Sequence, residues 1–534
     1  IPLQRATKGQ EGVITQWAFQ IIEKVGMLKM DFLGLANLTI LDAAHKIIQE
    51  RYPDLRLDLQ DLPAEYDEPT GQAKKTFDML GRGETTAVFQ LESGGMRRCL
   101  RLLRPTQVQH LLAIVALYRP GPMDSIPAFA AAKNGQTPVS YLHPDLEEIL
   151  RETYGICVYQ DQVLQIVRRI AGFSWGEADV LRKAMGKKIA SLMAEQREKF
   201  LTRTVEQGYQ QDFAVQLWAL IEPFAGYGFP KGHAAAYAVV AYQTAFLKAN
   251  YPAEYMAAVL TSEAGNTDKV AEAVAECRRL GVEVRPPDIN TSGLGFTLEG
   301  EPSPSVEGDP GTSIRFGLSG VKNVGHGAIE MLIKSREEGP GPFADLADLC
   351  RRVDLRQLNK RALESLVKAG AMDCLGDRAA LLAGLDTAMS LAQQHQRAQQ
   401  NGQTSLFDLF STEETPEAVA LPAFALPNVE SAGRKQRLAW EKEMVGLYIS
   451  EHPLAGMAPA LGRAVTCPTT DLTEDMAGQM VTLGGSISSM RIIATRKGDL
   501  MAALELEDLA GSVEVVVFPR TFQAHRELLQ EDAI

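Results

Sequence analysis

Apolar residues with the spacing of α-helices run through nearly half of the chain, and this periodicity constrains the fold more than any other feature. Apolar residues recur at spacings of three and four across residues 46–290, and the breaks are turns rich in glycine and proline, such as Tyr118–Pro122 and Gly226–Pro230. No run approaches the roughly 20 consecutive apolar residues of a membrane-spanning helix. The pattern therefore predicts a large helical domain that does not cross a membrane.

The chain before this domain has a mixed pattern. Val25–Leu35 is apolar except for Lys29 and Asp31, which predicts a strand, and a helix is expected from about Thr39. The chain starts at Ile1 without a methionine or a signal peptide, and its far end reads as unfinished. We expect a piece of a larger protein.

Smaller units are expected after the helical domain. A boundary at Pro286–Asn290 precedes a compact helical unit over residues 313–395 with two glycine turns. Residues 393–427 are rich in Gln, Ser, Thr and Glu, which predicts a flexible segment, and residues 431–475 return to a helix and a proline-rich turn. Three strand-like runs follow, which predict a small barrel of the oligonucleotide-binding type: Met480–Gly485, Met501–Glu507 and Ser512–Phe518.

Composition excludes some classes of protein. The net charge of −13 over 534 residues argues against a uniformly basic nucleic-acid coat, although it leaves room for local basic surfaces. The six cysteines are far apart and form no Cys-x-x-Cys pair, which excludes a zinc ribbon and a disulfide scaffold and fits a reducing cytoplasm.

Lys29 and Asp31 are the first candidate for chemistry. On a strand, residues two apart share a face, and a charged pair on an apolar strand loses hydration unless it meets a metal, a phosphate or its own partner. The aspartate could bind Mg²⁺ in a phosphoryl transfer. The two residues alone favour the plainer alternative, which is a salt bridge at a sheet edge.

Two basic clusters indicate binding of anions. Arg97, Arg98, Arg101 and Arg104 have no acid between them, and residues 181–203 hold seven bases against two acids. A solvated helix face is the alternative for both. Gly186, between the basic pairs of the second cluster, would let a ligand approach the backbone closely.

Glycine-rich turns before helices offer further phosphate sites. Residues 226–238 could bind a phosphate with help from Lys231 and His233, and Gly325–Gly327 could hold a DNA phosphate on its backbone amides. A second glycine turn at Asn359–Asp373 suggests a paired helix-hairpin-helix module. Structural turns and core aromatics remain the alternatives. In the flexible segment, Gln403–Phe407 carries exposed apolar residues that suit insertion into a partner's groove.

Six motifs, in this order, resemble the C-family of bacterial replicative DNA polymerases, the polymerase III alpha subunits. They are Lys29–Leu35, Ala87–Ser93, Leu117–Pro122, Val158–Gln162, Leu181–Lys188 and Phe224–Tyr237. The resemblance implies a multidomain, mainly α protein with a remnant of a polymerase-beta-like α/β palm and a partial oligonucleotide-binding β-barrel. The implied division is the end of the palm (1–45), fingers (46–290), a tandem helix-hairpin-helix region that binds DNA and the clamp (291–400), a clamp-binding peptide with a flexible linker (401–430), a connecting helical segment (431–475) and the partial barrel (476–534).

The resemblance also implies roles for individual residues. Asp31 would be the third catalytic carboxylate and a metal ligand, and Lys29 would lie beside the incoming triphosphate. The residues expected to bind nucleotide are Arg119, Arg182, Lys183, Lys187, Lys188 and His233. Those expected to contact DNA are Lys322, Gly325, Gly327, Lys360 and Gly370, and those that match the clamp-binding peptide are Gln403, Leu406 and Phe407.

The implied activity is template-directed DNA synthesis from dNTPs at a primer 3′-hydroxyl with two Mg²⁺ ions. The implied partners are primer-template DNA, dNTP and the sliding clamp (beta), with the proofreading exonuclease and the tau and clamp-loader subunits bound through other regions; a cytoplasmic protein is expected. The family's other two metal-binding aspartates lie in an upstream Asp-x-Asp motif that has no counterpart here, so the chain alone is expected to be inactive. The alternative is a non-catalytic DNA-binding adaptor recruited by the clamp.

Overall fold

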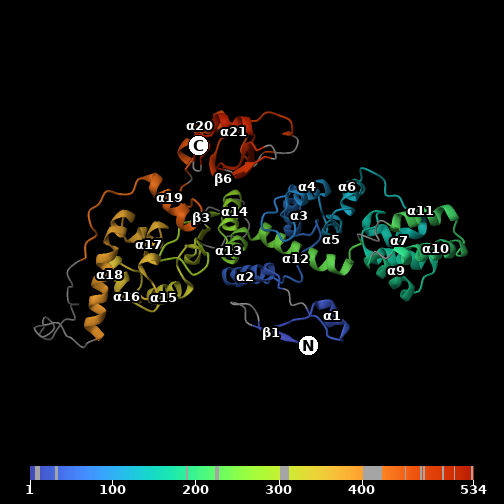
Figure 1. The fold of residues 1–534 in the computed structure, drawn as a ribbon, viewed down its shortest axis with the longest axis horizontal. Coiled ribbons are helices and arrows are strands. Elements are labelled where there is room, and N and C mark those ends of the chain that lie inside the picture. Colours follow the sequence, from blue (N-terminus) through green and yellow to red (C-terminus); the bar gives the residue numbers. More distant parts are fainter. Residues whose placement is uncertain are drawn as a thin grey trace, which may run out of the picture.

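The computed structural model describes residues 1–5, 12–30, 34–187, 190–222, 228–300, 312–400, 424–451, 453–469, 472, 476–495, 498–509, 511–530 and 533–534. Residues 185–187, 190, 395–400, 455 and 458 are described by their backbone alone. The helical domain, a further group of helices and a small C-terminal sheet follow one another along the chain (Figure 1). Over the described residues the fold is mainly helical, as the sequence predicts.

The N-terminal segment differs from its prediction. Strand β1 (Leu3–Arg5) pairs antiparallel with β2 (Val13–Thr15), and helix α1 (Phe19–Lys24) follows. Residues 25–30 form no strand, so the expected strand over Val25–Leu35 is wrong in its described part. Leu28 is 82% exposed, and no strand lies beside this segment to complete a hydrogen-bonded ladder among the described residues. Apolar residues alone therefore do not make a strand here.

The helical domain is built around helix α12. Its helices are α2 (Ala36–Arg51), α3 (Gln72–Arg82), α4 (Gly94–Leu103), α5 (Val108–Leu117), α6 (Ile126–Lys133), α12 (Lys231–Asn250), α13 (Pro252–Ser262) and α14 (Thr267–Arg279). Helix α12 packs against α5 and α3, and α13 packs against α2. Alanines at 234, 238, 241 and 245 are fully buried, which lets the neighbouring helices approach α12 closely. Figure 1 shows α12 lying beneath α3, α4 and α5.

A second hydrophobic core lies within the same stretch of sequence. Its helices are α7 (Glu147–Leu150), α8 (Gln160–Ala171), α9 (Trp175–Lys187), α10 (Ala190–Glu206) and α11 (Gln211–Ile221). Phe200 and Trp218 are buried at its centre, and its members form a cluster separate from the main core. In Figure 1 this unit forms one end of the molecule. The predicted helical region thus contains two cores.

The main core continues past the expected boundary at Pro286–Asn290. Strand β3 (Glu283–Arg285) pairs parallel with β5 (Ser313–Arg315), which pairs antiparallel with β4 (Thr297–Glu299). Ile289 and Phe316 are buried in the same cluster as α12. Helices α15 (His326–Glu337), α16 (Leu346–Arg352), α17 (Lys360–Lys368), α18 (Arg378–Gln400) and α19 (Arg434–Val445) follow.

The C-terminal sheet has three antiparallel strands in the order β6-β7-β8. Helix α20 (Ala458–Ala464) precedes β6 (Ser486–Ala494), β7 (Leu500–Glu507), β8 (Ser512–Val517) and α21 (Pro519–His525). The second and third predicted strands are confirmed. The first is wrong, because the strand begins at Ser486 rather than Met480, which is 98% exposed. Gly485 lies against Glu507, where a side chain would collide with the backbone at 2.5 Å.

A buried charge cluster joins three parts of the main core. Lys248 of α12 is fully buried, and its Nζ donates to the carbonyl oxygens of Glu84 at 2.8 Å and Thr86 at 2.7 Å. The same Nζ lies 2.5 Å from Oε1 of Glu276, which also binds Arg279 at 2.7 Å. Burial lowers the pKa of Lys248, and the charge of Glu276 opposes that shift. Every donor of this buried ammonium has an acceptor.

All six cysteines are free in the structure. Across the part of the chain that the structure describes, no helix is both long enough and apolar enough to span a bilayer.

Candidate nucleotide and nucleic-acid interfaces

Helix α9 starts at a capping box. The Ser174 amide donates to Oε2 of Glu177 at 2.8 Å, and the Glu177 amide donates back to the Ser174 hydroxyl at 3.3 Å. This reciprocal pair satisfies two amides of the first turn and fixes where the helix begins. The capping box therefore positions every side chain along α9.

Arg182 and Lys183 share one acidic partner on α9. Nη2 of Arg182 lies 2.7 Å from Asp179, and Nζ of Lys183 lies 2.9 Å from its other oxygen. Hydrogen bonds from Lys183 and Arg182 lower the pKa of Asp179. Both cations are more than two-fifths exposed. Two positive charges against one negative leave this exposed face net positive.

Other cations of the second basic cluster, over residues 181–203, are held in ion pairs that the charge count of this stretch does not show. Glu177 binds Nζ of Lys199 at 2.8 Å and Nη1 of Arg203 at 2.9 Å, and these two bonds hold its pKa far below the usual value. Glu177 and Asp179 lie just before the stretch counted from Leu181. Counted from residue 177, the segment holds seven bases against four acids. Part of the predicted positive charge is thus used in packing α9 against α10.

Arg119 and His233 meet through an aromatic ring. The guanidinium of Arg119 lies 4.2 Å from the ring centroid of Phe229 and donates to the Ala116 carbonyl at 2.7 Å. The His233 ring lies edge-on to Phe229 at 5.1 Å and 4.3 Å from the ring of Tyr237. Burial lowers the pKa of Arg119. The structure brings these two predicted nucleotide-binding residues together, at the N-terminus of α12.

The remaining residues of the predicted catalytic and nucleotide sites are only partly described. Asp31 and Lys188 lie outside the described residues, and Lys187 is placed in α9 by its backbone alone. Nζ of Lys29 lies 5.0 Å from the ring centroid of Phe19 on the exposed N-terminal segment. Among the described residues, no three His, Cys, Asp or Glu side chains converge as metal ligands would.

The first predicted hairpin leaves its glycines open to solvent. Gly325 is the N-cap of α15 with φ −79° and ψ 152°, a conformation that any residue adopts. A Cβ added at Gly325 would have no neighbour within 4 Å, and one at Gly327 would meet only Gln357 at 4.0 Å. Lys322 is exposed beside them. Neither backbone strain nor internal packing requires these glycines, which leaves room for a ligand.

In the second predicted hairpin, contacts within the protein account for the glycine and the lysine. Gly370 ends α17 with φ +83°, where its amide bonds the Val367 carbonyl and the Ala371 amide bonds that of Leu366. A Cβ at Gly370 would collide with Nη2 of Arg378. Nζ of Lys360 lies 2.7 Å from Asp386. The DNA role of Gly370 and Lys360 remains a sequence prediction.

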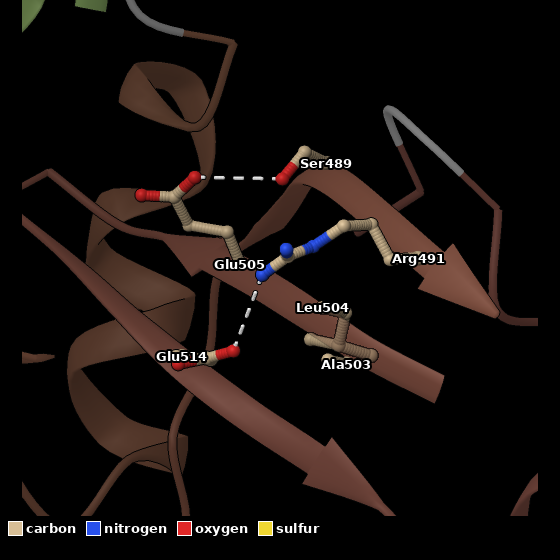
Figure 2. Close-up of a pocket in the computed structure, with 6 residues that line it drawn as sticks. All are labelled: Ser489, Arg491, Ala503, Leu504, Glu505 and Glu514. Atoms are coloured by element: carbon tan, nitrogen blue, oxygen red, sulfur yellow. Dashed lines mark hydrogen bonds and ion pairs between the residues drawn. The ribbon is translucent and has the colours of Figure 1, made fainter. Parts of the chain in front are cut away.

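The outer face of the C-terminal sheet is hollowed and carries more acid than base. Figure 2 shows Arg491 reaching across the hollow toward Glu514, with Nη2 3.6 Å from Oε1, and Ser489 beside Glu505 at 3.5 Å. Two carboxylates face one guanidinium, which disfavours a phosphate backbone on this face. The predicted clamp-binding residues Gln403, Leu406 and Phe407 lie outside the described residues.

Sequence reasoning overlooked the partners of the predicted cations and one exposed aromatic. Asp179 lies three and four residues before Arg182 and Lys183, which is the spacing of helical ion pairs and could have identified it. Trp175 is 59% exposed, and the guanidinium of Arg168 stacks on its ring. Helical spacing would place Trp175 and Arg182 on one face, but only the structure shows the stacked arginine.

Known sequences align with this chain over its whole length. Residues 37–208 match the bacterial DNA polymerase III alpha subunit finger domain, and residues 281–381 match a helix-hairpin-helix motif. DNA polymerase III subunit alpha of Thermus aquaticus is 43% identical over 100% of this chain and 42% of its own length. The corresponding proteins of Saccharopolyspora erythraea and Mycobacterium tuberculosis H37Rv are 42% and 40% identical, each over 100% of this chain and 44% of the relative. The chain spans less than half the length of these relatives.

Proposed function

This chain belongs to the family of bacterial DNA polymerase III alpha subunits, and we propose that it supplies the fingers and the DNA-gripping region of a replicative DNA polymerase. The proposed reaction is transfer of a nucleotide from a dNTP to a primer 3′-hydroxyl with release of pyrophosphate. The finger-domain match over residues 37–208 carries this proposal and favours it over a non-catalytic adaptor. The domain division given above and a cytoplasmic location are part of the proposal.

The exposed cations of α9 support a role in binding the triphosphate. Arg182 and Lys183 flank Asp179 on the surface of α9, and this one shared partner leaves one positive charge unbalanced. A guanidinium can bind phosphate oxygens in pairs, whereas an ammonium acts as a point charge. Both would offset the negative charge that develops on the phosphates during transfer. Arg119 and His233 would extend this surface from the start of α12.

The proposed reaction also needs divalent cations, and the residue of this chain that would bind them lies outside the described residues. Asp31 would hold Mg²⁺ together with two aspartates supplied by polypeptide outside this chain. The bound ions would lower the pKa of the primer hydroxyl and stabilise the attacking and leaving oxygens. Lys29 would lie near the same phosphates.

Replacing Arg182 with alanine in the complete polymerase tests the proposed triphosphate contact. We expect the KM for dNTP to rise about tenfold or more, because a hydrogen bond to a charged group contributes roughly 1.5–3 kcal/mol. Steady-state primer extension at varied dNTP concentration measures this. Arg151 is a matched control, since it is an exposed arginine of the same unit in a helical ion pair with Glu147. An unchanged KM in Arg182→Ala would contradict the contact.

The open hairpin at the start of α15 supports binding of DNA without sequence preference. The exposed amides around Gly325 and Gly327 could hold one phosphate, with Lys322 adding a positive charge nearby. The helix-hairpin-helix match covers these residues. Lys360 and Gly370 would contribute a second, weaker contact.

A valine at Gly325 should weaken DNA binding without disturbing the fold. Its side chain would occupy the space that a phosphate needs, so we expect the Kd for primer-template DNA to rise about tenfold. Fluorescence anisotropy with labelled duplex at fixed salt measures the change. Gly433 is the matched control, because it is the N-cap of α19 with φ −59°, ψ 156° and no neighbour within 4 Å of an added Cβ. Equal affinities for the Gly325→Val and Gly433→Val variants would contradict the proposal.

Attachment to a sliding clamp completes the proposal. Gln403, Leu406 and Phe407 would insert into a groove on the clamp, which raises the effective concentration of the enzyme at the primer end. Primer-template DNA and dNTP are the other proposed partners. The proofreading exonuclease and the tau and clamp-loader subunits would bind regions outside this chain. Residues 476–534 would form part of an oligonucleotide-binding barrel.

A further inference from the structure

Trp175, at the start of α9, presents an exposed indole ring that is backed on one side. The residue is 59% exposed, although tryptophan is a residue that folding usually buries. The guanidinium carbon of Arg168, from the last turn of α8, lies 3.5 Å from its ring centroid. One face of the indole is therefore covered by a cation, and the high exposure requires the other face to be open.

Arg168 is a platform rather than part of a salt bridge in the described structure. Its Nε is buried and has no hydrogen-bond partner among the described residues. An arginine that stacks on an indole holds the ring in place through a cation–π contact. The ring is thus positioned before any ligand arrives, which lowers the entropy lost on binding.

Trp175 lies on the same face of α9 as the proposed triphosphate contact. Seven residues separate it from Arg182, which is close to two full turns, and the buried Ala178 and Leu181 lie along one flank of that face. Seven residues rise about 10 Å along a helix. This offset suits a nucleotide that stacks its base on the indole and extends its phosphates toward Arg182 and Lys183.

We propose that Trp175, held by Arg168, is a stacking surface for a nucleobase whose phosphates point toward Arg182 and Lys183. This inference rests on the proposed function and adds a residue to its nucleotide site. An aromatic face accepts any of the four bases, so the contact provides affinity without selecting sequence. The base could belong to the incoming dNTP or to an unpaired position of the DNA strand, which share this chemistry.

The test compares Trp175→Ala and Trp175→Phe in the complete polymerase. We expect Trp175→Ala to raise either the KM for dNTP or the Kd for single-stranded oligonucleotide about tenfold, as loss of one base stack does. Trp175→Phe keeps a ring and should retain most of the affinity. Fluorescence supplies a second readout, because quenching on addition of ligand should be smaller in Trp175→Phe than in the wild-type protein.

Each outcome identifies the source of the base or overturns the proposal. A change in KM alone assigns the incoming nucleotide, and a change in oligonucleotide Kd alone assigns the DNA strand. Val180 is the matched control, since it is 38% exposed on the same helix but lies away from this face, and Val180→Ala should change neither constant. Primer extension with both constants unchanged in Trp175→Ala would overturn the stacking surface and leave the proposed function standing. A complete wild-type protein without primer extension would overturn the function itself.

Discussion

Replacing Asp31 with asparagine in the complete polymerase is expected to reduce primer extension by about a thousandfold or more. The change keeps the size of the side chain and removes one negative charge. In the proposed function that charge holds divalent cations, whose stabilisation of the reacting phosphate contributes several kcal/mol, and each 1.36 kcal/mol changes the rate tenfold. Extension of a primed template at saturating dNTP and Mg²⁺ measures the loss.

Asp42 provides the control for this substitution. It is an exposed carboxylate within α2 that pairs with Nζ of Lys46 at 2.7 Å, so Asp42→Asn should leave extension nearly unchanged. Asp31→Asn should also keep its affinity for primer-template DNA, which separates lost chemistry from lost binding. Extension by Asp31→Asn at close to the wild-type rate would refute the proposed role of this carboxylate.

Replacing Lys248 with methionine is expected to lower the free energy of unfolding by about 3–5 kcal/mol, the usual cost of breaking a buried ion pair. The substitution leaves the carboxylate of Glu276 buried with Arg279 as its remaining charged partner. It also removes the donor to the half-buried carbonyl groups of Glu84 and Thr86, which then lose this hydrogen-bond partner. Thermal and urea unfolding of the complete protein should both show the loss.

Two further variants make this experiment specific. Lys269 pairs with Glu263 at 2.9 Å while 57% exposed, so Lys269→Met should cost less than about 1 kcal/mol. Removing both charges of the buried pair in Lys248→Met/Glu276→Gln should restore part of the stability lost in the single variant. Equal losses of unfolding free energy for Lys248→Met and Lys269→Met would show that the buried cluster stabilises the protein no more than an exposed ion pair.

Periodicity predicted the helices well because helical order is local. The helical spacing of apolar residues over 46–290 reflects which side of each helix is buried, and the structure places helices through that stretch. Strands depend on partners that can be distant in sequence. Val25–Met30 has the composition of a strand but has no neighbouring strand among the described residues, whereas Ser486–Ala494 pairs with Leu500–Glu507 and becomes one. The separate core around Trp218 had no signal in sequence because it shares its helical pattern with the main core.

In the candidate sites too, the sequence predicted the local features and missed those that depend on packing. The motif Leu181–Lys188 located the exposed cations of α9, yet charge counting overstated their freedom because Glu177 and Asp179 come one turn earlier. Gly325 and Gly370 look alike in sequence. In the structure the first is open and the second is required by a left-handed turn against Arg378. Such a difference depends on three-dimensional packing, which no local pattern encodes.

The two separate helical cores have a mechanical consequence. The described link between them includes a parallel bridge from Tyr159 to Phe229 and hydrogen bonds from Gln160 to the carbonyl oxygens of Phe229 at 3.0 Å and Gly228 at 2.8 Å. A unit with its own core can swing as a rigid body while its interior stays packed. A pivot at Tyr159–Gln160 would move Trp175 and Arg182 together, so one hinge motion would bring both side chains to a nucleotide at the same time.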